Sequence, residues 1–237
     1  MKVSKTPHLN RTLKYILSRT YQPVVSRYLR RTRIFRYGEL RLTIPNGVFH
    51  PGFFRSTKIL LKYLDGLPVA GKRFLELGAG NGLISLAAAK RRAIVTATDI
   101  NANAVNNLQE NSKANQLPIE TIHSDLFADI PHRSFDIVAI NPPYYKKDPE
   151  SPEEHAWYCG TEGQYFQKLF EQIGAYLHSE SIVLMILSEE CDLEMIRRIA
   201  SDHEYDLTKV LEKKVLSERL YIFRIVGPQT LPDGKVN

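Results

Sequence analysis

The chain of 237 residues is 43% hydrophobic and 24% charged, which is typical of a soluble globular protein with one well-buried core. It has no apolar stretch long enough to span a bilayer, so we expect no integral membrane association. Its two cysteines, Cys159 and Cys191, and its seven scattered histidines show no disulfide or metal-ligand spacing, so we expect no metal site. These features favour a cytoplasmic protein.

The formal net charge of +6 is distributed unevenly along the chain. Residues 1–41 hold 11 Lys and Arg and one acidic residue, Glu39, which is a local net charge of +10. The other 196 residues have a net charge of −4. The basic charge therefore belongs to an N-terminal arm, and this asymmetry indicates a polyanionic partner.

The arm begins with a pattern typical of an amphipathic helix, since five apolar residues from Leu9 to Tyr21 share one helical face. This face could pack on the body of the protein, or the basic helix could lie on a membrane surface. Residues 31–37 and 40–44 then predict two strands around Gly38. We expect residues 1–46 to form a basic N-terminal extension of helix and hairpin.

After a loop and a helix at 56–64, the pattern alternates between strand and helix, which predicts a parallel sheet covered on both faces. The last two strands have no helix between them, so we expect an antiparallel hairpin at the sheet edge, followed by a tail at 228–237. The expected strands are 73–77, 94–98, 119–123, 135–140, 181–187, 205–214 and 219–226, and the expected helices are 82–91, 101–115, 162–177 and 189–202.

The first strand of this region runs into a glycine-rich turn with the spacing G-x-G-x-G, formed by Gly78, Gly80 and Gly82. Glycine permits a tight turn and lets a ligand approach the backbone closely. The spacing differs from the G-x-G-x-x-G of dinucleotide sites, which argues against an NAD-dependent oxidoreductase.

The sequence Asn141-Pro142-Pro143-Tyr144 follows an apolar run that predicts a buried strand. Two adjacent prolines remove two backbone N–H donors, so this loop cannot extend the sheet. It offers acceptors instead, namely the side-chain oxygen of Asn141 and the carbonyl of Pro142, and Tyr144 adds a flat aromatic face. This combination suits a planar –NH2 group.

The order of Glu76 to Gly82, Asp99, the Ser124-Asp125 pair and Asn141 to Tyr144 resembles that of class I S-adenosylmethionine (SAM)-dependent methyltransferases. The resemblance covers roughly Gly47 to Ile225, and we expect the methyltransferase domain at 47–227. It implies an α/β, Rossmann-like fold with a mostly parallel seven-stranded sheet and a C-terminal antiparallel hairpin. The Asn-Pro-Pro-Tyr branch of this family methylates planar nitrogens, either glutamine amides in release factors or amines of adenine or guanine.

The resemblance also implies which residues bind SAM. The backbone of the three glycines would contact its amino acid and ribose portions, and the carboxylate of Glu76 would approach its amino group. Asp99, with Asn101 as a helper, would bind the ribose hydroxyls, although either residue could instead cap the helix at 101–115.

Four further residues are expected to contribute to the SAM site. Asp125 would accept from the adenine amine, and Leu126 would pack on the ring. Phe53 and Thr57 resemble a segment that folds over the methionine portion, although the phenylalanines near Phe53 could simply be core. Asn141 would contact both SAM and the acceptor.

The expected catalytic residues are Asn141, Pro142 and Tyr144. Accepting both hydrogens of the acceptor nitrogen would let that nitrogen pyramidalise, and Tyr144 would hold it against the methyl carbon. Catalysis would therefore be positioning plus electrostatics, with no general base.

Two acceptors remain open, a protein glutamine and an RNA or DNA base, and we expect the acceptor to belong to the translation machinery. The block Trp157–Gly163 resembles that of glutamine-amide methyltransferases, with Cys159 in place of one glycine. The basic arm instead favours contact with RNA or the ribosome. A sequence-specific DNA enzyme is disfavoured because no target-recognition domain is evident. The alternative function is a non-catalytic SAM-fold protein that binds RNA or a partner.

Overall fold

The computed structural model describes residues 32–45, 55–152, 154–215 and 218–228. The amphipathic helix expected between Leu9 and Tyr21, and the expected site residue Phe53, lie outside the described residues.

The elements of the α/β body follow the expected alternation of strands and helices. Their bounds are α2 Arg55–Leu64, β3 Arg73–Leu77, α3 Leu83–Lys90, β4 Ile94–Asp99, α4 Ala102–Asn115, β5 Ile119–His123, β6 Ile137–Ile140, η1 Glu154–Ala156, α5 Gln164–Ile173, η2 Gly174–Tyr176, β7 Ile182–Ser188, α6 Leu193–Asp202, β8 Asp206–Val215 and β9 Glu218–Val226.

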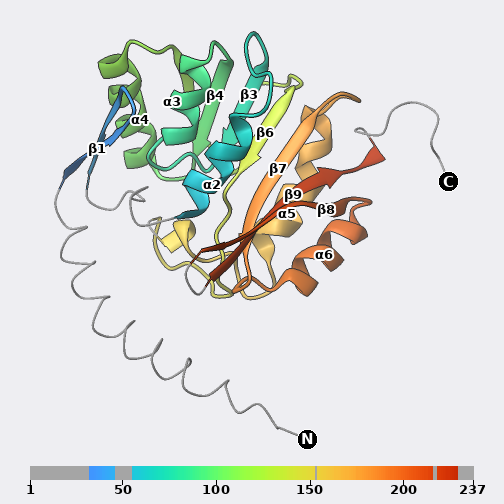
Figure 1. The fold of residues 1–237 in the computed structure, drawn as a ribbon. Coiled ribbons are helices and arrows are strands. Elements are labelled where there is room, and N and C mark those ends of the chain that lie inside the picture. The colour runs from blue at the N-terminus through green and yellow to red at the C-terminus, as the bar shows by residue number, and fades with distance from the viewer. Residues whose placement is uncertain (1–31, 46–54, 153, 216–217, 229–237) are drawn as a thin grey trace, which may run out of the picture.

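The strands form a seven-stranded sheet in the order β5-β4-β3-β6-β7-β9-β8 (Figure 1). The five strands from β5 to β7 pair in parallel, whereas β9 pairs antiparallel to both β7 and β8. The expected mostly parallel sheet with a C-terminal antiparallel hairpin is therefore confirmed. The helix expected at 162–177 is shorter, because α5 ends at Ile173 and continues as the 3₁₀ turn η2.

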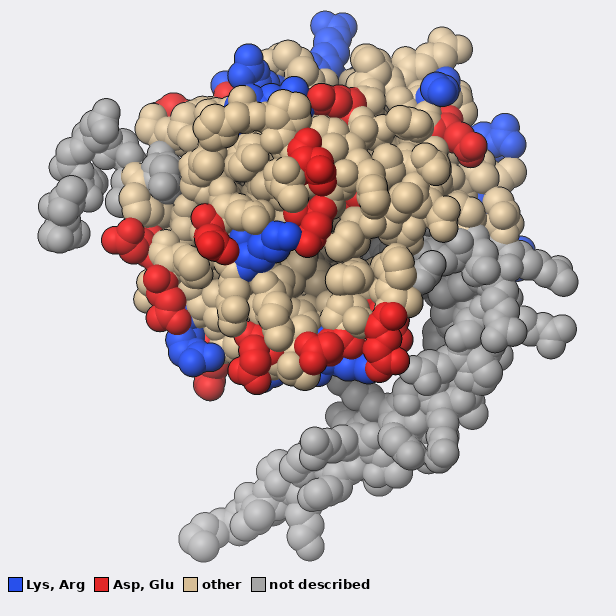
Figure 2. Space-filling model, turned by 180° about the vertical axis from the view of Figure 1, so that it is seen from behind, with Lys and Arg blue, Asp and Glu red and all other residues tan. Residues whose placement is uncertain are grey.

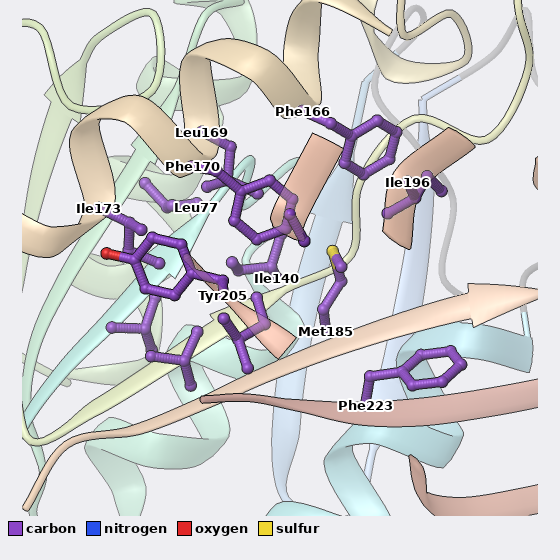
Figure 3. Close-up of a cluster of buried hydrophobic side chains, with 14 of the residues drawn as sticks. Leu77, Ile140, Phe166, Leu169, Phe170, Ile173, Met185, Ile196, Tyr205 and Phe223 are labelled. Carbon is purple, nitrogen blue, oxygen red and sulfur yellow. The ribbon is translucent and has the colours of Figure 1, made fainter. Parts of the chain in front are cut away.

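Helices cover both faces of the sheet, as a parallel sheet requires. The helices α2, α3 and α4 pack with one cluster of buried apolar side chains, and α5 and α6 pack with the other. In Figure 3 the side chains of Phe166, Phe170 and Ile173 project from α5 toward the sheet, where they join β7 residues such as Met185. Every residue of β6 is buried, which places its C-terminal end inside the molecule.

The expected N-terminal hairpin is confirmed as β1 (Arg33–Tyr37) and β2 (Leu40–Ile44), which pair antiparallel. The apolar residues of β2 are buried in the same cluster as α2, α3 and α4, so the hairpin packs on the α/β body. The boundary expected after residue 46 stays a prediction.

Asparagine side chains of α4 bind the edge of β2. The backbone N–H of Thr43 donates to Oδ1 of Asn111 (2.8 Å), and its carbonyl accepts from Nδ2 of Asn107 and of Asn111 (both 2.9 Å). One turn further along α4, Asn115 bonds both the N–H and the carbonyl of Arg41 (3.0 and 2.8 Å). Residues spaced four apart share one helical face, so α4 pairs with the strand edge much as a neighbouring strand would.

We expect Asn111→Ala to lower the free energy of unfolding by about 1–3 kcal/mol, because it leaves the partly buried N–H of Thr43 without its acceptor. The shift in the midpoint of urea denaturation measures this loss. Asn106→Ala, an exposed position on the same helix, is the matched control and should change stability by less than about 0.5 kcal/mol. Equal effects of the two substitutions would refute the role of Asn111.

Candidate active site

The expected site residues gather at the carboxyl edge of the parallel strands. The glycine turn follows β3, Asp99 ends β4, the Ser124-Asp125 pair follows β5, and Asn141 follows β6. Ligands of open α/β sheets bind in the crevice at this edge. The topology therefore brings four sequence motifs to one place.

Asp99 ties the glycine turn to β4. Its Oδ2 accepts from the N–H of Gly80 (2.8 Å), and its Oδ1 accepts from the N–H of Asn101 (2.8 Å). Burial raises the pKa of this carboxyl group, and the two backbone donors oppose that shift. Asn101 caps α4, since its side chain accepts from the N–H of Asn103 (2.9 Å). Of the two residues considered as caps of this helix, Asn101 is therefore the one that caps it. A role of Asn101 in binding a ligand stays a prediction.

The glycines of the turn meet two different structural demands. Gly78 and Gly82 both have positive φ values (68° and 76°), which favour glycine. A Cβ on Gly78 would meet no heavy atom within 4 Å, so open space lies beside its backbone. A Cβ on Gly82 would lie 2.1 Å from Cδ1 of Leu108, so close packing against α4 also requires this glycine.

Glu76 is buried beneath the glycine turn. Its Oε2 accepts from the backbone N–H of Ser85 (2.8 Å) and from the Ser85 hydroxyl. Burial raises the pKa of the Glu76 carboxyl group to about 8, and the negative charge of Asp99 adds to this shift. Ser85 is a partner that our sequence analysis missed, nine residues away on the following helix.

The raised pKa of Glu76 predicts a pH-dependent stability. The folded protein retains a proton that the unfolded chain releases near pH 4.5, so the stability that Glu76 contributes is fully present below pH 4.5 and is lost as the pH rises to about 8. The slope is at most about 1.4 kcal/mol per pH unit. We expect Glu76→Gln, measured by urea denaturation across this range, to remove this component. Parallel curves for the two proteins would contradict the buried protonated carboxyl group.

Asp125 lies at the end of β5 and forms an ion pair with Lys168 of α5. Leu126 follows it with a positive φ of 54°, and the carbonyl of Leu126 accepts from the hydroxyl of Ser124 (2.9 Å). Tyr165, one turn before Lys168, lies close enough to Asp99 and Asp125 for their charges to add to the raised pKa that burial gives its hydroxyl. The first turn of α5 therefore faces the candidate SAM site, which the sequence did not indicate.

The side chain of Asn141 is held from two sides. Its Nδ2 lies 3.5 Å from Oγ1 of Thr57 in α2, and its Oδ1 accepts from the hydroxyl of Tyr144 (3.1 Å). Burial raises the pKa of Tyr144, so this hydroxyl stays protonated and can donate. An amide oxygen has two lone pairs, so Asn141 retains acceptor capacity for a ligand. Thr57 is thus beside Asn141, and Tyr144 orients the amide as well as offering its ring.

The segment after Tyr144 folds back beside the Asn-Pro-Pro-Tyr loop. The N–H of Tyr145 donates to the carbonyl of Trp157, and its carbonyl accepts from the N–H of Cys159 (both 2.9 Å). The hydroxyl of Tyr145 also donates to Glu190 (3.1 Å). The block Trp157–Gly163 therefore lies against the candidate catalytic loop.

In the part of the chain that the structure describes, no group of three or more His, Cys, Asp or Glu residues could hold a metal ion. None of the described helices is both long and apolar enough to cross a membrane.

A comparison with protein families agrees with this geometry. The methyltransferase small domain profile matches residues 39–186, which is more than half of the chain. The chain belongs to this family. The match includes the glycine turn, Asp99 and the Asn-Pro-Pro-Tyr loop, so the resemblance seen in the motifs is confirmed at the level of the family.

Relatives with known names fall into several classes of methyltransferase. The release factor glutamine methyltransferase of Streptococcus pneumoniae is 32% identical over 130 residues, which is 54% of this chain and 39% of that protein. The tRNA1(Val) (adenine(37)-N6)-methyltransferase of Pedobacter heparinus is 30% identical over 130 residues, which is 50% of this chain and 55% of that protein. The chain thus spans about half the length of these relatives.

Among solved structures, the fold is similar to that of the 16S rRNA N2 G1207 methyltransferase of T. thermophilus, determined with AdoMet and guanosine. The TM-score is 0.60 at 20% identity, covering 82% of this chain and 50% of that chain. The Mtq2 subunit of E. cuniculi, from a complex with Trm112 that methylates eRF1, gives a TM-score of 0.59 at 21% identity, covering 76% and 99%. These likenesses establish the Rossmann-like methyltransferase fold.

Proposed function

We propose that this protein is an N-methyltransferase that transfers a methyl group from SAM to a planar amide or amino nitrogen of a macromolecule in the translation machinery. The observation that carries the proposal is the position of Asn141. It stands at the carboxyl end of a fully buried strand, fixed by Thr57 and Tyr144, at the same sheet edge as the glycine turn and Asp99.

The residues at this edge fit SAM by their chemistry. The open space beside Gly78 leaves room for a ligand against the backbone. Asp99 supplies carboxylate oxygens suited to a pair of ribose hydroxyls, and Glu76 supplies a carboxyl group that can ionise beside a cationic amino group. Asp125 can accept from an adenine amine. The ion pair with Lys168 restricts the position of the Asp125 carboxylate.

When bound, SAM supplies an electrophilic methyl group on a sulfonium sulfur. Asn141 and the carbonyl of Pro142 accept the two hydrogens of the acceptor nitrogen and fix its orientation. The Tyr144 hydroxyl donates to the Asn141 amide oxygen and so fixes the orientation of this amide. The Tyr144 ring supports the planar acceptor group. The remaining catalytic work is electrostatic, since preorganised acceptors stabilise the positive charge that develops on the nitrogen.

Relatives named for a glutamine of release factors and for an adenine of tRNA support the choice of a macromolecular acceptor. We propose that the activity is cytoplasmic and that the basic N-terminal arm contacts RNA or the ribosome there.

The test is methyl transfer from radiolabelled SAM into a lysate of cells that lack this protein, with aliquots treated with RNase or protease. Label that is lost to either treatment supports N-methyl transfer to that class of acceptor. A protein that binds SAM but labels nothing would refute the enzymatic function and favour the non-catalytic alternative.

A further inference from the structure

Acidic residues are concentrated next to the catalytic loop. The segment 148–162, which lies against the catalytic loop, holds five acidic residues and no Lys or Arg. Viewed from the side opposite to Figure 1, acidic side chains spread across the surface and most basic ones lie toward its rim (Figure 2). The described lysines nearest this segment are neutralised, since Lys146 pairs with Asp192, Lys147 with Glu154, and Lys168 with Asp125.

Helix α2 carries several exposed cations. Helix α2 contains no acidic residue, and its exposed cations Arg55, Lys58 and Lys62 fall at i, i+3 and i+7, on one side of the helix. Among the described residues, no ion pair involves Lys58 or Lys62. The stripe begins next to Thr57, the residue that contacts Asn141.

The hairpin lies beside this stripe. Lys58 Nζ lies 5.7 Å from the centroid of the Phe35 ring, which packs toward the body of the protein, so α2 lies beside β1. On the outward side of the hairpin, Arg36 and Arg41 are directly opposite each other in register and both exposed. Like charges directly opposite across two strands are destabilising, so this pair is unfavourable until an anion lies over it. Ile34, 55% exposed, stands next to them on the same outward side.

Resting on the proposed function, we propose that Arg36, Arg41, Lys58 and Lys62, with Ile34, form a cationic face that binds single-stranded RNA and leads one of its bases to Asn141. The acceptor is then an amino nitrogen of an RNA base. Cations that track a phosphate backbone, together with an exposed apolar side chain against which a base can pack, are the components of a single-strand binding surface.

The far side of the catalytic loop limits how RNA can approach. Glu190 accepts from Tyr145, and burial together with Glu190 raises the pKa of Glu218. Glu189 bonds the backbone of Arg219 at the same place. These carboxyl groups disfavour a phosphate backbone at this end of the loop, although the charge of Arg55 at the start of α2 opposes the raised pKa of Glu218.

The test measures binding of a fluorescent, unstructured 20-nucleotide RNA to the full-length protein at several salt concentrations, without SAM. The variants are Lys58→Gln/Lys62→Gln and Arg36→Gln/Arg41→Gln. The control is Arg198→Gln/Lys209→Gln, which removes the same charge from α6 and β8. We expect each face variant to bind at least about tenfold more weakly in dilute salt, and the salt slope to fall by about 1.4, since each single-strand phosphate contact contributes about 0.7.

Unchanged melting temperatures would show that the face variants are folded, and Arg36→Gln/Arg41→Gln should melt no lower than the wild type because it removes a like-charge pair. Equal weakening in the control, wild-type binding by both face variants, or tighter binding to phosphatidylserine vesicles than to RNA would overturn the proposal. Label from SAM that enters protein while RNA binding stays intact would overturn the RNA acceptor. RNA binding with no transfer to any acceptor would instead refute the proposed enzymatic function and leave the binding surface standing.

Discussion

Asn141→Ala is expected to reduce the methyl transfer rate by about 10²–10³-fold or more while leaving the dissociation constant of SAM near that of the wild type. The amide oxygen of Asn141 is a preorganised group at the reacting nitrogen, and removal of one such group costs enzymes about this factor. Radiolabel incorporation under single-turnover conditions and calorimetric titration of SAM measure the two quantities separately.

The fold should survive this substitution. The hydroxyl of Tyr144 loses Asn141 but keeps a second acceptor, the carbonyl of Ile186 at 3.4 Å. The matched control is Asn106→Ala on the exposed side of α4, which should transfer methyl groups at the wild-type rate. Unchanged turnover in Asn141→Ala would remove this residue from the mechanism.

Asp99→Ala is expected to weaken SAM binding by about 1.5–3 kcal/mol, or about 10- to 150-fold, because hydrogen bonds to a charged group contribute this much. The loss has two sources. The substitution removes the proposed acceptor of the ribose hydroxyls, and it also releases the N–H of Gly80, which Asp99 holds at 2.8 Å.

The variant Asp99→Asn removes the carboxylate charge and keeps one side-chain oxygen, which can accept from the N–H of Gly80 or of Asn101 but not from both. Full recovery of SAM binding in Asp99→Asn would show that the carboxylate charge is not required. Asp202→Ala, at the end of α6, is the control for the loss of one surface carboxylate. Wild-type SAM affinity in Asp99→Ala would exclude Asp99 from the binding site.

The fold was largely predictable because its signals are local. The strand at 73–77 and its neighbours are short apolar runs, and each is followed by a helix with its own periodicity. Gly78 and the two prolines after Asn141 each restrict or free the backbone at a single position, so the sequence alone predicts the turn and the loop that they form. The helix end near Ile173 was less predictable, since Gly174, which follows it, keeps right-handed helical backbone angles and the chain continues as the 3₁₀ turn η2.

The partners of the site residues were not predictable in the same way. Asn141 and Thr57 are 84 residues apart, and Asp125 and Lys168 are 43 residues apart. The bond between Asn111 and Thr43 spans 68 residues, and only the spacing of asparagines along α4 could have signalled it. Such contacts depend on how helices pack across a sheet, which no local pattern specifies.

The sequence by itself determined the Rossmann-like alternation, the glycine turn, the carboxylates after β4 and β5 and the acceptor-rich loop after β6. It could do so because each depends on the hydrophobic period or backbone freedom of a few neighbouring residues. Only the tertiary structure decided that Tyr144 orients Asn141, that Glu76 is buried against Ser85, and that α2 lies beside the N-terminal hairpin. These features arise when packing on both sides of the sheet brings distant segments together and removes their polar groups from water.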